Sequence, residues 1–268
     1  MSGPRAYLRS LSPGLPRSVW TLEAGFLVNA YGTGVAASLL FSTLLPLVPE
    51  PMRYEVAAGS GERRGGYLDV IRHRPFLGLV FLNFVFISVG QTQLELLPVF
   101  AKNEAGVNER QIGLIFLVST LVLVVCQLPL AKLLEGRSRM RALALMPALW
   151  AMAWLVVEAG GAWFEAAAAA LVFGLAAAVF GLGECLHGPT QGALVADLAP
   201  PLLRGRYLAL SSSSWDLGYV AGPAIGGAVL AVAPLALWPL AAAICLAAAA
   251  GTLLLERVIP RELRLTPG

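Results

Sequence analysis

The sequence contains apolar runs too long for a soluble domain to cover. No charged side chain occurs between Leu217 and Leu255, and residues 111–131 (QIGLIFLVSTLVLVVCQLPLA) are uncharged as well. The chain is 57% hydrophobic and 13% charged, whereas ordinary globular domains carry about a quarter charged residues. None of the runs alternates in the manner of a barrel strand. The sequence therefore predicts an all-α, polytopic membrane helical bundle.

Seven stretches are long enough to cross a bilayer, whose core of about 30 Å needs roughly 20 apolar helical residues. They are residues 20–48, 76–99, 111–131, 142–158, 165–190, 207–231 and 235–255. Only a break around Pro234 separates the last two, which predicts a tight helical hairpin.

Lysine and arginine predict the orientation of the last six stretches. Fourteen of these residues lie in alternate connections and in the C-terminal tail: Arg53, Arg63, Arg64, Arg72, Arg74, Lys132, Arg137, Arg139, Arg141, Arg204, Arg206, Arg257, Arg261 and Arg264. The intervening connections hold only Lys102 and Arg110. Because basic loops stay in the cytoplasm, the C-terminus is predicted to be cytoplasmic.

The first stretch does not fit this alternation. The N-terminal tail carries Arg5, Arg9 and Arg17 without an acidic residue, so it is predicted to be cytoplasmic too. A single span cannot join two cytoplasmic flanks. Either the tail is forced outside, or residues 20–48 form a re-entrant or surface-lying element. Residues 50–75 form a polar linker that is expected to end in a short amphipathic helix around residues 67–73.

Six spans after a basic linker resemble the C-terminal half of a major facilitator superfamily transporter of the drug/proton antiporter-like kind. The resemblance covers about residues 50–260. QLPLAKLLEGRSRMRALAL (127–145) is similar to the family's basic turn between helices eight and nine. GECLHGPTQGALVADLAPPLLRGRY (183–207) is close to the region of helices ten and eleven.

The N-terminal residues resemble two separate parts of the same family. LPRSVWTLEAGFLVNAYGTG (15–34) resembles the start of helix one, and SLLFSTLLPLVPEP (38–51) resembles the end of helix six. The two pieces join near residues 35–37, which suggests that most of helices one to six is missing from this chain. The expected organisation is a remnant of the N-terminal half (1–49), a cytoplasmic linker (50–75), a six-helix bundle (76–256) and a cytoplasmic tail (257–268).

Polar residues inside the predicted spans are candidates for substrate or proton binding, because such residues are costly in a bilayer. Gln91 and Glu95 are four residues apart and share a helix face, with Asn83 two turns back on roughly the same side. A cavity that they line could bind a polar or cationic substrate. Alternatively, Glu95 lies at the membrane interface and is simply hydrated.

Two further carboxyl groups, Glu184 and Asp216, fall in the cytoplasmic halves of their predicted spans. A carboxyl group in a bundle interior can take up and release a proton as access alternates between the two sides of the membrane. The alternative is a carboxylate that bonds to the serines at 211–214 or to a loop arginine. For Asn83 and Gln91, as for Gln191 and Trp215, ordinary packing is the simpler interpretation.

The stretch GYVAGPAIGG (218–227) combines glycines and a proline in an apolar span. Glycines at every fourth position line one helix face, where another helix backbone can approach closely, and an internal proline bends a helix. The residues expected to pack or gate are Gly218, Gly222, Pro223, Gly226 and Gly227. In antiporters of the family that this chain resembles, the same sequence pattern is the signature of helix five, which belongs to the N-terminal half of the transporter.

The basic turn after residue 135 is expected to lie in the cytoplasm. The resemblance implies that Arg137, Arg139 and Arg141, together with Arg204 and Arg206, brace neighbouring helices by ion pairs that differ between inward-open and outward-open states. Ordinary positive-inside topology is the alternative.

No metal site, cofactor or enzymatic centre is predicted. The three cysteines lie in apolar runs, and the only histidines are His73 and His187. Glu184 and His187 have the ExxH spacing of a di-iron ligand pair, but the sequence lacks the second copy that such a site needs. Ser/His and Ser/Lys constellations are absent as well.

The resemblance implies transmembrane transport of small molecules, with proton-coupled multidrug or metabolite efflux across the cell membrane. The expected partners are the lipid bilayer, a small-molecule substrate and protons, and no nucleic acid. The alternative is a truncated, non-transporting membrane protein, or a half-transporter that needs a complementary half or self-association.

Overall fold

The structure is a computed structural model that describes residues 66–91 and 93–264. These residues belong to one compact unit, 63–268, which is described here by itself. The predictions for residues 20–48, for the two N-terminal family-like pieces and for the basic N-terminal tail lie outside the described residues.

Six helices in the described part are long and apolar enough to span a membrane, so the all-α, six-span prediction is confirmed. The first span consists of three segments: α4 (Arg74–Val85), the π-helix η2 (Phe86–Gln91) and α5 (Gln93–Ala105). The others are α6 (Glu109–Leu134), α7 (Arg139–Trp163), α8 (Ala166–Leu198), α9 (Arg204–Val232) and α10 (Leu237–Glu256). As predicted, a short helix, α3 (Tyr67–Arg72), precedes them. Single 3₁₀ turns, η3 (Pro201–Leu203), η4 (Pro234–Ala236) and η5 (Arg261–Leu263), occur at the connections and in the tail.

The helix ends follow local sequence signals. Asn108 begins α6 through a capping box: its side chain accepts a hydrogen bond from the Gln111 backbone, and the Gln111 side chain accepts one from the Asn108 backbone. Gly136 follows the end of α6 with φ of 70°, a left-handed conformation that glycine adopts without strain. Ser138 then caps α7 by accepting a hydrogen bond from the Arg141 backbone. The turn between α6 and α7 is therefore encoded locally.

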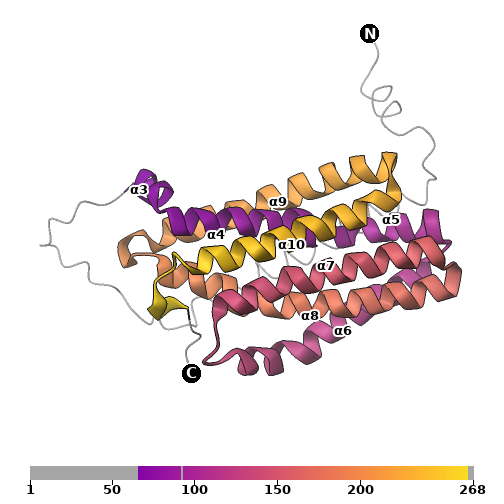
Figure 1. Cartoon of the computed structure of the whole chain (residues 1–268), viewed down its shortest axis with the longest axis horizontal. Coiled ribbons are helices and arrows are strands. Elements are labelled where there is room, and N and C mark those ends of the chain that lie inside the picture. Colours follow the sequence, from indigo (N-terminus) through magenta and orange to yellow (C-terminus); the bar gives the residue numbers. More distant parts are fainter. Residues whose placement is uncertain (1–65, 92, 265–268) are drawn as a thin grey trace, which may run out of the picture. The chain divides into compact units, whose positions relative to one another are not determined.

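The order of packing differs from the order in the chain (Figure 1). α8 packs between α7 and α6, α7 packs against α10, and α9 packs against α4 and η2. The prediction of a hairpin from the last two spans is correct for the tight connection, η4, but wrong for the packing. α10 lies mainly against α7 and α4 and contacts α9 little. α6 and α9 are consequently the least buried of the six spans.

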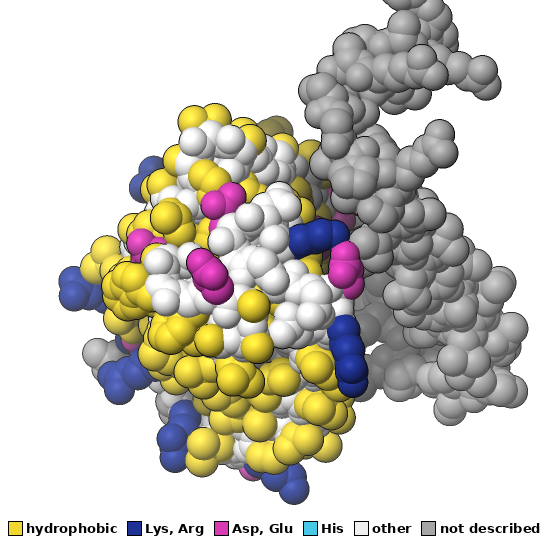
Figure 2. All heavy atoms as spheres, turned by 90° about the vertical axis from the view of Figure 1, so that its right-hand side faces the viewer, with side chains coloured by type: hydrophobic (Ala, Val, Ile, Leu, Met, Phe, Trp, Pro, Cys, Tyr) yellow, Lys and Arg dark blue, Asp and Glu magenta, His cyan; other side chains and the backbone are white. Residues whose placement is uncertain are grey.

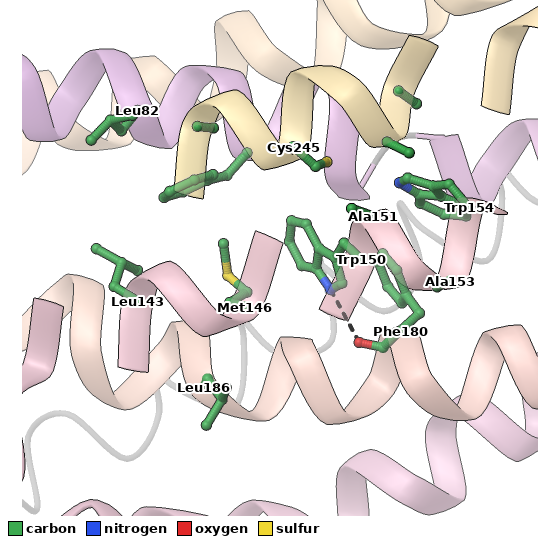
Figure 3. Close-up of a cluster of buried hydrophobic side chains, with 14 of the residues drawn as sticks. Leu82, Leu143, Met146, Trp150, Ala151, Ala153, Trp154, Phe180, Leu186 and Cys245 are labelled. Carbon is green, nitrogen blue, oxygen red and sulfur yellow. Dashed lines mark hydrogen bonds between the residues drawn. The ribbon is translucent and has the colours of Figure 1, made fainter. Parts of the chain in front are cut away.

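Large aromatic side chains fill the centre of the bundle (Figure 3). The rings of Trp150 and Phe180 are stacked, with centroids 4.9 Å apart. Trp154 and Trp238 continue the cluster from α7 to α10, with ring centroids 5.6 Å apart. All four side chains are essentially inaccessible to solvent. This cluster holds α7 between α8 and α10.

Trp150 lies against two glycines on different spans. A Cβ at Gly183, on α8, would lie 2.6 Å from the indole Nε1, and a Cβ at Gly90, in η2, would lie 2.0 Å from the indole ring. Because neither glycine carries a side chain, the indole reaches the α8 backbone and donates a hydrogen bond from Nε1 to the Phe180 carbonyl, at 3.1 Å. Trp150 therefore joins α7, α8 and η2 at one point.

The two ends of the bundle differ in their charged side chains. Figure 2 looks onto the end where α5 meets α6 and α7 meets α8, and it shows acidic and basic side chains scattered among hydrophobic side chains and backbone. Lys102 and Glu109 form an exposed salt bridge at this end, with 2.6 Å between Nζ and Oε1. The opposite end carries most of the arginines.

Substituting Gly183 with alanine is expected to destabilise the bundle, because the new Cβ would collide with the Trp150 indole. Overpacking of this kind costs about 1–3 kcal/mol. Gly174→Ala on the same helix is the matched control, since a Cβ there meets no atom within 4 Å. That control is expected to be neutral or stabilising by up to ~1 kcal/mol. Thermal unfolding in detergent, followed by circular dichroism, measures both; equal melting temperatures would contradict the packing described.

Candidate functional site

A pair of polar side chains lies beside the two glycines that hold Trp150. Gln91 follows Gly90 in η2, and Glu184 follows Gly183 in α8. The Gln91 amide donates a hydrogen bond from Nε2 to Oε1 of Glu184, at 3.4 Å. Because both residues are chain neighbours of glycines packed on one indole, the Trp150 contact places them opposite each other.

Two more polar residues occur on other segments, Tyr219 on α9 and Glu95 on α5. Tyr219 is 40% exposed, and its ring centroid lies 6.3 Å from that of Trp215. Glu184 is half-buried, whereas Glu95 is exposed on α5.

A second polar cluster is buried deeper in the bundle, around Asn83 of α4. Asn83 is inaccessible to solvent. Its Nδ2 donates to Oγ of Ser214 on α9 at 2.8 Å. Its Oδ1 lies 3.0 Å from Nε2 of His187 on α8. One side chain therefore connects three spans by hydrogen bonds.

The donor and the acceptor of each hydrogen bond in this cluster can be assigned. The Ser214 hydroxyl donates to the Ser211 carbonyl at 2.6 Å, so its oxygen is an acceptor toward Asn83. Asn83 must then present its amide nitrogen to Ser214 and its oxygen to His187. Since that oxygen only accepts, Nε2 of His187 carries the proton, and a neutral imidazole keeps Nδ1 as an acceptor. The network thus selects one tautomer of His187.

Aromatic rings enclose the imidazole. The Trp215 ring, from α9, lies 5.0 Å from the His187 ring between centroids. Phe86, at the start of η2, meets it edge-on at 6.3 Å. Uncharged imidazole is compatible with such surroundings, which would not solvate a cation well.

The predicted candidates separate into distinct places. Asn83 belongs to the buried network, and Gln91 pairs with Glu184, so the structure brings three of the five into hydrogen-bonded clusters. Glu95 and Asp216 are exposed. Two of the four serines suggested as partners for Asp216 use their hydroxyls elsewhere: Ser213 bonds to the Ala209 carbonyl and Ser214 to the Ser211 carbonyl.

The π-helix explains why the expected common face of Asn83, Gln91 and Glu95 is absent. Face predictions assume 3.6 residues per turn, and η2 winds the chain more loosely between Asn83 and Glu95. Asn83 is consequently buried while Glu95 is exposed. Gln93, buried just after η2, donates from Nε2 to the Ser88 carbonyl within it at 2.9 Å, which supports the irregular turn.

The glycines of α9 face the first span. Gly218, Gly222 and Gly226 are buried, and Gly227 is partly exposed. A Cβ at Gly218 would lie 2.6 Å from Ile87, and one at Gly226 would lie 2.5 Å from Oε1 of Gln93. This face therefore allows α9 to approach η2 and α5 closely. Pro223 lies within the helix, which continues through it.

The basic turn meets the ends of three other segments. The guanidinium of Arg139, almost fully buried, forms a salt bridge to Asp197 near the end of α8, with 2.5 Å between Nη1 and Oδ2. The Arg139 backbone N–H donates to the Arg264 carbonyl in the tail. Ser138 donates to Glu256, the last residue of α10.

The other arginines predicted to brace the helices lie at the surface or against a ring. Arg137, Arg141 and Arg204 are exposed, and the Arg206 guanidinium lies over the Tyr67 ring, 5.8 Å from its centroid.

A histidine lies at the same end of the bundle. Nδ1 of His73, before α4, is 2.8 Å from the Tyr207 hydroxyl at the start of α9. Burial lowers the pKa of His73. The contact joins the starts of two spans.

Two residues with structural roles were not predicted from the sequence: His187, which bonds to Asn83, and Asp197, which pairs with Arg139. In the sequence, His187 stands out only as half of an ExxH pair with Glu184. The sequence did contain a signal for the role of His187, because a histidine inside an apolar span needs a hydrogen-bond partner. No group of three or more His, Cys, Asp and Glu side chains suited to a metal ion occurs among residues 66–91 and 93–264.

Comparisons with known proteins agree with this architecture. The family model described as Major Facilitator Superfamily matches residues 79–267. The chain is also 36% identical over 64 residues to the uncharacterized MFS-type transporter YdeE of Escherichia coli (strain K12). That match covers 24% of this chain and 16% of the relative.

The link between Asn83 and His187 is expected to appear as an interaction energy between them. Hydrogen bonds between membrane helices average about 0.6 kcal/mol in double-mutant cycles, with a maximum of ~1.7 kcal/mol. We expect a coupling in this range for Asn83→Leu and His187→Leu, measured by unfolding in SDS. Asn83→Leu with Thr120→Ala is the control pair, since the Thr120 hydroxyl bonds to its own helix. Strict additivity for Asn83 and His187 would refute the network.

Proposed function

The chain belongs to the Major Facilitator Superfamily, a family of membrane transporters rather than enzymes, and from this premise we propose that it serves proton-coupled efflux of small molecules. The residues that we assign to coupling are Glu184, with Gln91 as its partner, and Asp216. The substrate is a drug or a metabolite, and the membrane is the plasma membrane. Transporters of this kind place their sites near the bilayer midplane, between helices.

The observation that supports this proposal most is the hydrogen bond between Glu184 and Gln91. It joins two spans near the middle of each, at residues 91 and 184 of spans 74–105 and 166–198. At 3.4 Å it is long for a hydrogen bond, so little free energy is lost when it opens. A glutamine amide can pair with a protonated or an ionised carboxyl group, because it both donates and accepts.

Glu95 supports the same proposal. It is a further carboxyl group of the bundle, exposed on α5, the segment that follows η2 and Gln91. We propose that a cationic or polar substrate contacts both Glu95 and Glu184. Proton binding at Glu184 would then weaken its attraction for the cation, and this is the coupling that an exchanger needs.

A second candidate function follows from the edges of the bundle. Within the described part of the chain, only 11% of the most apolar 18-residue stretch of α6 is buried, and only 17% of the most apolar 18-residue stretch of the span that contains α9. We propose, as the alternative, a non-transporting subunit that pairs with a complementary transporter half or a second copy. The efflux experiment below separates the two functions.

Glu184→Gln is expected to abolish proton-driven efflux, because the amide cannot carry a proton, and Asp216→Asn is expected to weaken it. The measurement is release of a fluorescent cation from membrane vesicles that contain the chain alone, under an imposed pH gradient. Glu104→Gln, an exposed carboxyl at the α5–α6 end, is the matched control and should transport normally. Unchanged efflux in Glu184→Gln would show that Glu184 does not carry the coupled proton.

If the correctly inserted chain moves no cation at all, the subunit function is favoured. Insertion is verified separately, by the membrane topology of the same preparation.

The arginine-rich end of the bundle is expected to face the cytoplasm by the positive-inside rule. A protease-cleavable tag at the C-terminus should resist protease in intact cells and be cut after permeabilisation. A tag inserted after Gly106, in the turn between α5 and α6, should be cut in intact cells. The reverse pattern would invert the proposed orientation.

A further inference from the structure

The short helix α3 forms a corner of the bundle together with the starts of α4 and α9. It contacts both of these helices, and Figure 1 shows it at the end of the bundle where α4 begins. Val70 of α3 is inaccessible to solvent and belongs to the same buried cluster as Phe76 and Tyr207. The rings of Phe76 and Tyr207 lie 4.3 Å apart between centroids. The position of α3 is therefore determined by packing against two membrane spans.

The outward face of α3 is apolar. Tyr67, Leu68 and Ile71 are 55%, 68% and 48% exposed. They are one, three and four positions apart in the chain, so they form one stripe along the helix. On the other side of α3, the Asp69 carboxylate accepts a hydrogen bond from the Gly66 backbone N–H at 2.7 Å. A helix with an apolar stripe opposite polar residues is typical of a segment that lies in the membrane–water interface.

Four arginines occur at the same corner, one in α3, one at the start of α4 and two in the first turn of α9: Arg72, Arg74, Arg204 and Arg206. The first three are exposed, and the guanidinium of the fourth lies over the Tyr67 ring. Asp69 is the only acidic residue among residues 66–74 and 200–208. The corner therefore combines a net positive charge with an apolar stripe.

This corner lies at the level where the apolar spans begin. Arg74 is the first residue of the span 74–105, and the span 201–232 begins at the same corner. Because the apolar part of each span fills the hydrocarbon core, side chains at the start of a span lie at the level of the lipid headgroups. Guanidinium groups bind phosphate strongly, since they present several N–H donors in one plane. Basic clusters beside a membrane span attract anionic lipids.

We infer that the corner formed by α3 and the starts of α4 and α9 binds an anionic phospholipid, such as phosphatidylglycerol, in the leaflet at the arginine-rich end. The lipid phosphate accepts hydrogen bonds from Arg72 and Arg74, and an acyl chain lies against Leu68 and Ile71. The inference goes beyond the proposed function, because it requires only that the chain spans a membrane and requires no transport.

Three probes test the chemistry of the ligand. The full chain in detergent is titrated with phosphatidylglycerol or phosphatidylcholine of the same acyl chains, and native mass spectrometry measures the apparent Kd of the first lipid adduct. Phosphatidylglycerol should bind at least about fivefold more tightly, because it alone carries a net charge. Glycerol 3-phosphate, which has the phosphate without acyl chains, should not displace it at equal concentration.

Two pairs of charge substitutions test the location. Arg72→Gln with Arg74→Gln should abolish the preference for phosphatidylglycerol. Lys132→Gln with Arg141→Gln removes two exposed charges from α6 and α7 at the same end of the bundle and should leave the preference unchanged.

The apolar stripe is tested separately. Leu68→Ser with Ile71→Ser should weaken phosphatidylglycerol binding at least ~threefold, because less apolar surface contacts the acyl chain. Leu133→Ser, exposed at the end of α6, is the control and should bind normally. Circular dichroism establishes that each variant is folded, and if one of the α3 pairs is not, the other decides.

The inference is overturned if the α3 pairs bind phosphatidylglycerol as the wild type does, or if the control variants lose binding equally. Equal binding of the two lipids would leave a protein partner as the occupant of the α3 face, and displacement by glycerol 3-phosphate would identify a site for free phosphate; either result also overturns it. None of these measurements depends on efflux, so a chain that binds phosphatidylglycerol without moving a cation would refute the transport proposal alone.

Discussion

The position of Trp150 against Gly90 and Gly183 is the contact on which the rest of the described bundle depends. Lipid tails are as apolar as the helices, so membrane helices associate through close packing and hydrogen bonds rather than through hydrophobic burial. One indole that touches the backbones of two other spans provides both, because its Nε1 also bonds to the Phe180 carbonyl. The next residue on each glycine-bearing span is a member of the Gln91–Glu184 pair. The glycines that pack on Trp150 and the candidate site residues are thus neighbours in the sequence and in space.

The two polar clusters differ in rigidity. Every hydrogen bond around Asn83 has a determined direction, three spans contribute, and the central residue is fully buried. A network of this kind holds helices in one arrangement, because breaking any bond leaves an unpaired polar group in an apolar interior. Glu184 is half-buried and makes a long bond to Gln91. The Asn83 network is therefore the more rigid of the two clusters.

Part of the candidate site could be predicted from the sequence, and the failures have specific causes. Asn83, Gln91 and Glu184 were identified because polar side chains are rare inside apolar spans. Their partners were not, since Ser214 and His187 lie more than a hundred residues from Asn83 in the chain. Glu95 was placed on the same face as Asn83 by assuming a regular helix, and the π-helix between them invalidates that assumption. The salt bridge between Arg139 and Asp197 was likewise hidden, because it joins helix ends that only the fold brings together.

The sequence by itself determined the number of spans in the described part, their approximate limits and the helical turns between them. These properties are local: a bilayer of fixed thickness and the need to pair every backbone N–H within it require runs of about 20 apolar residues in helices. Only the tertiary structure decided that α10 packs on α7 rather than on α9, and that α3 packs at the starts of α4 and α9. Both outcomes depend on which apolar surfaces fit closest together. Apolar helix faces look alike in sequence, and they differ only in the shapes that side chains and glycines produce when they meet.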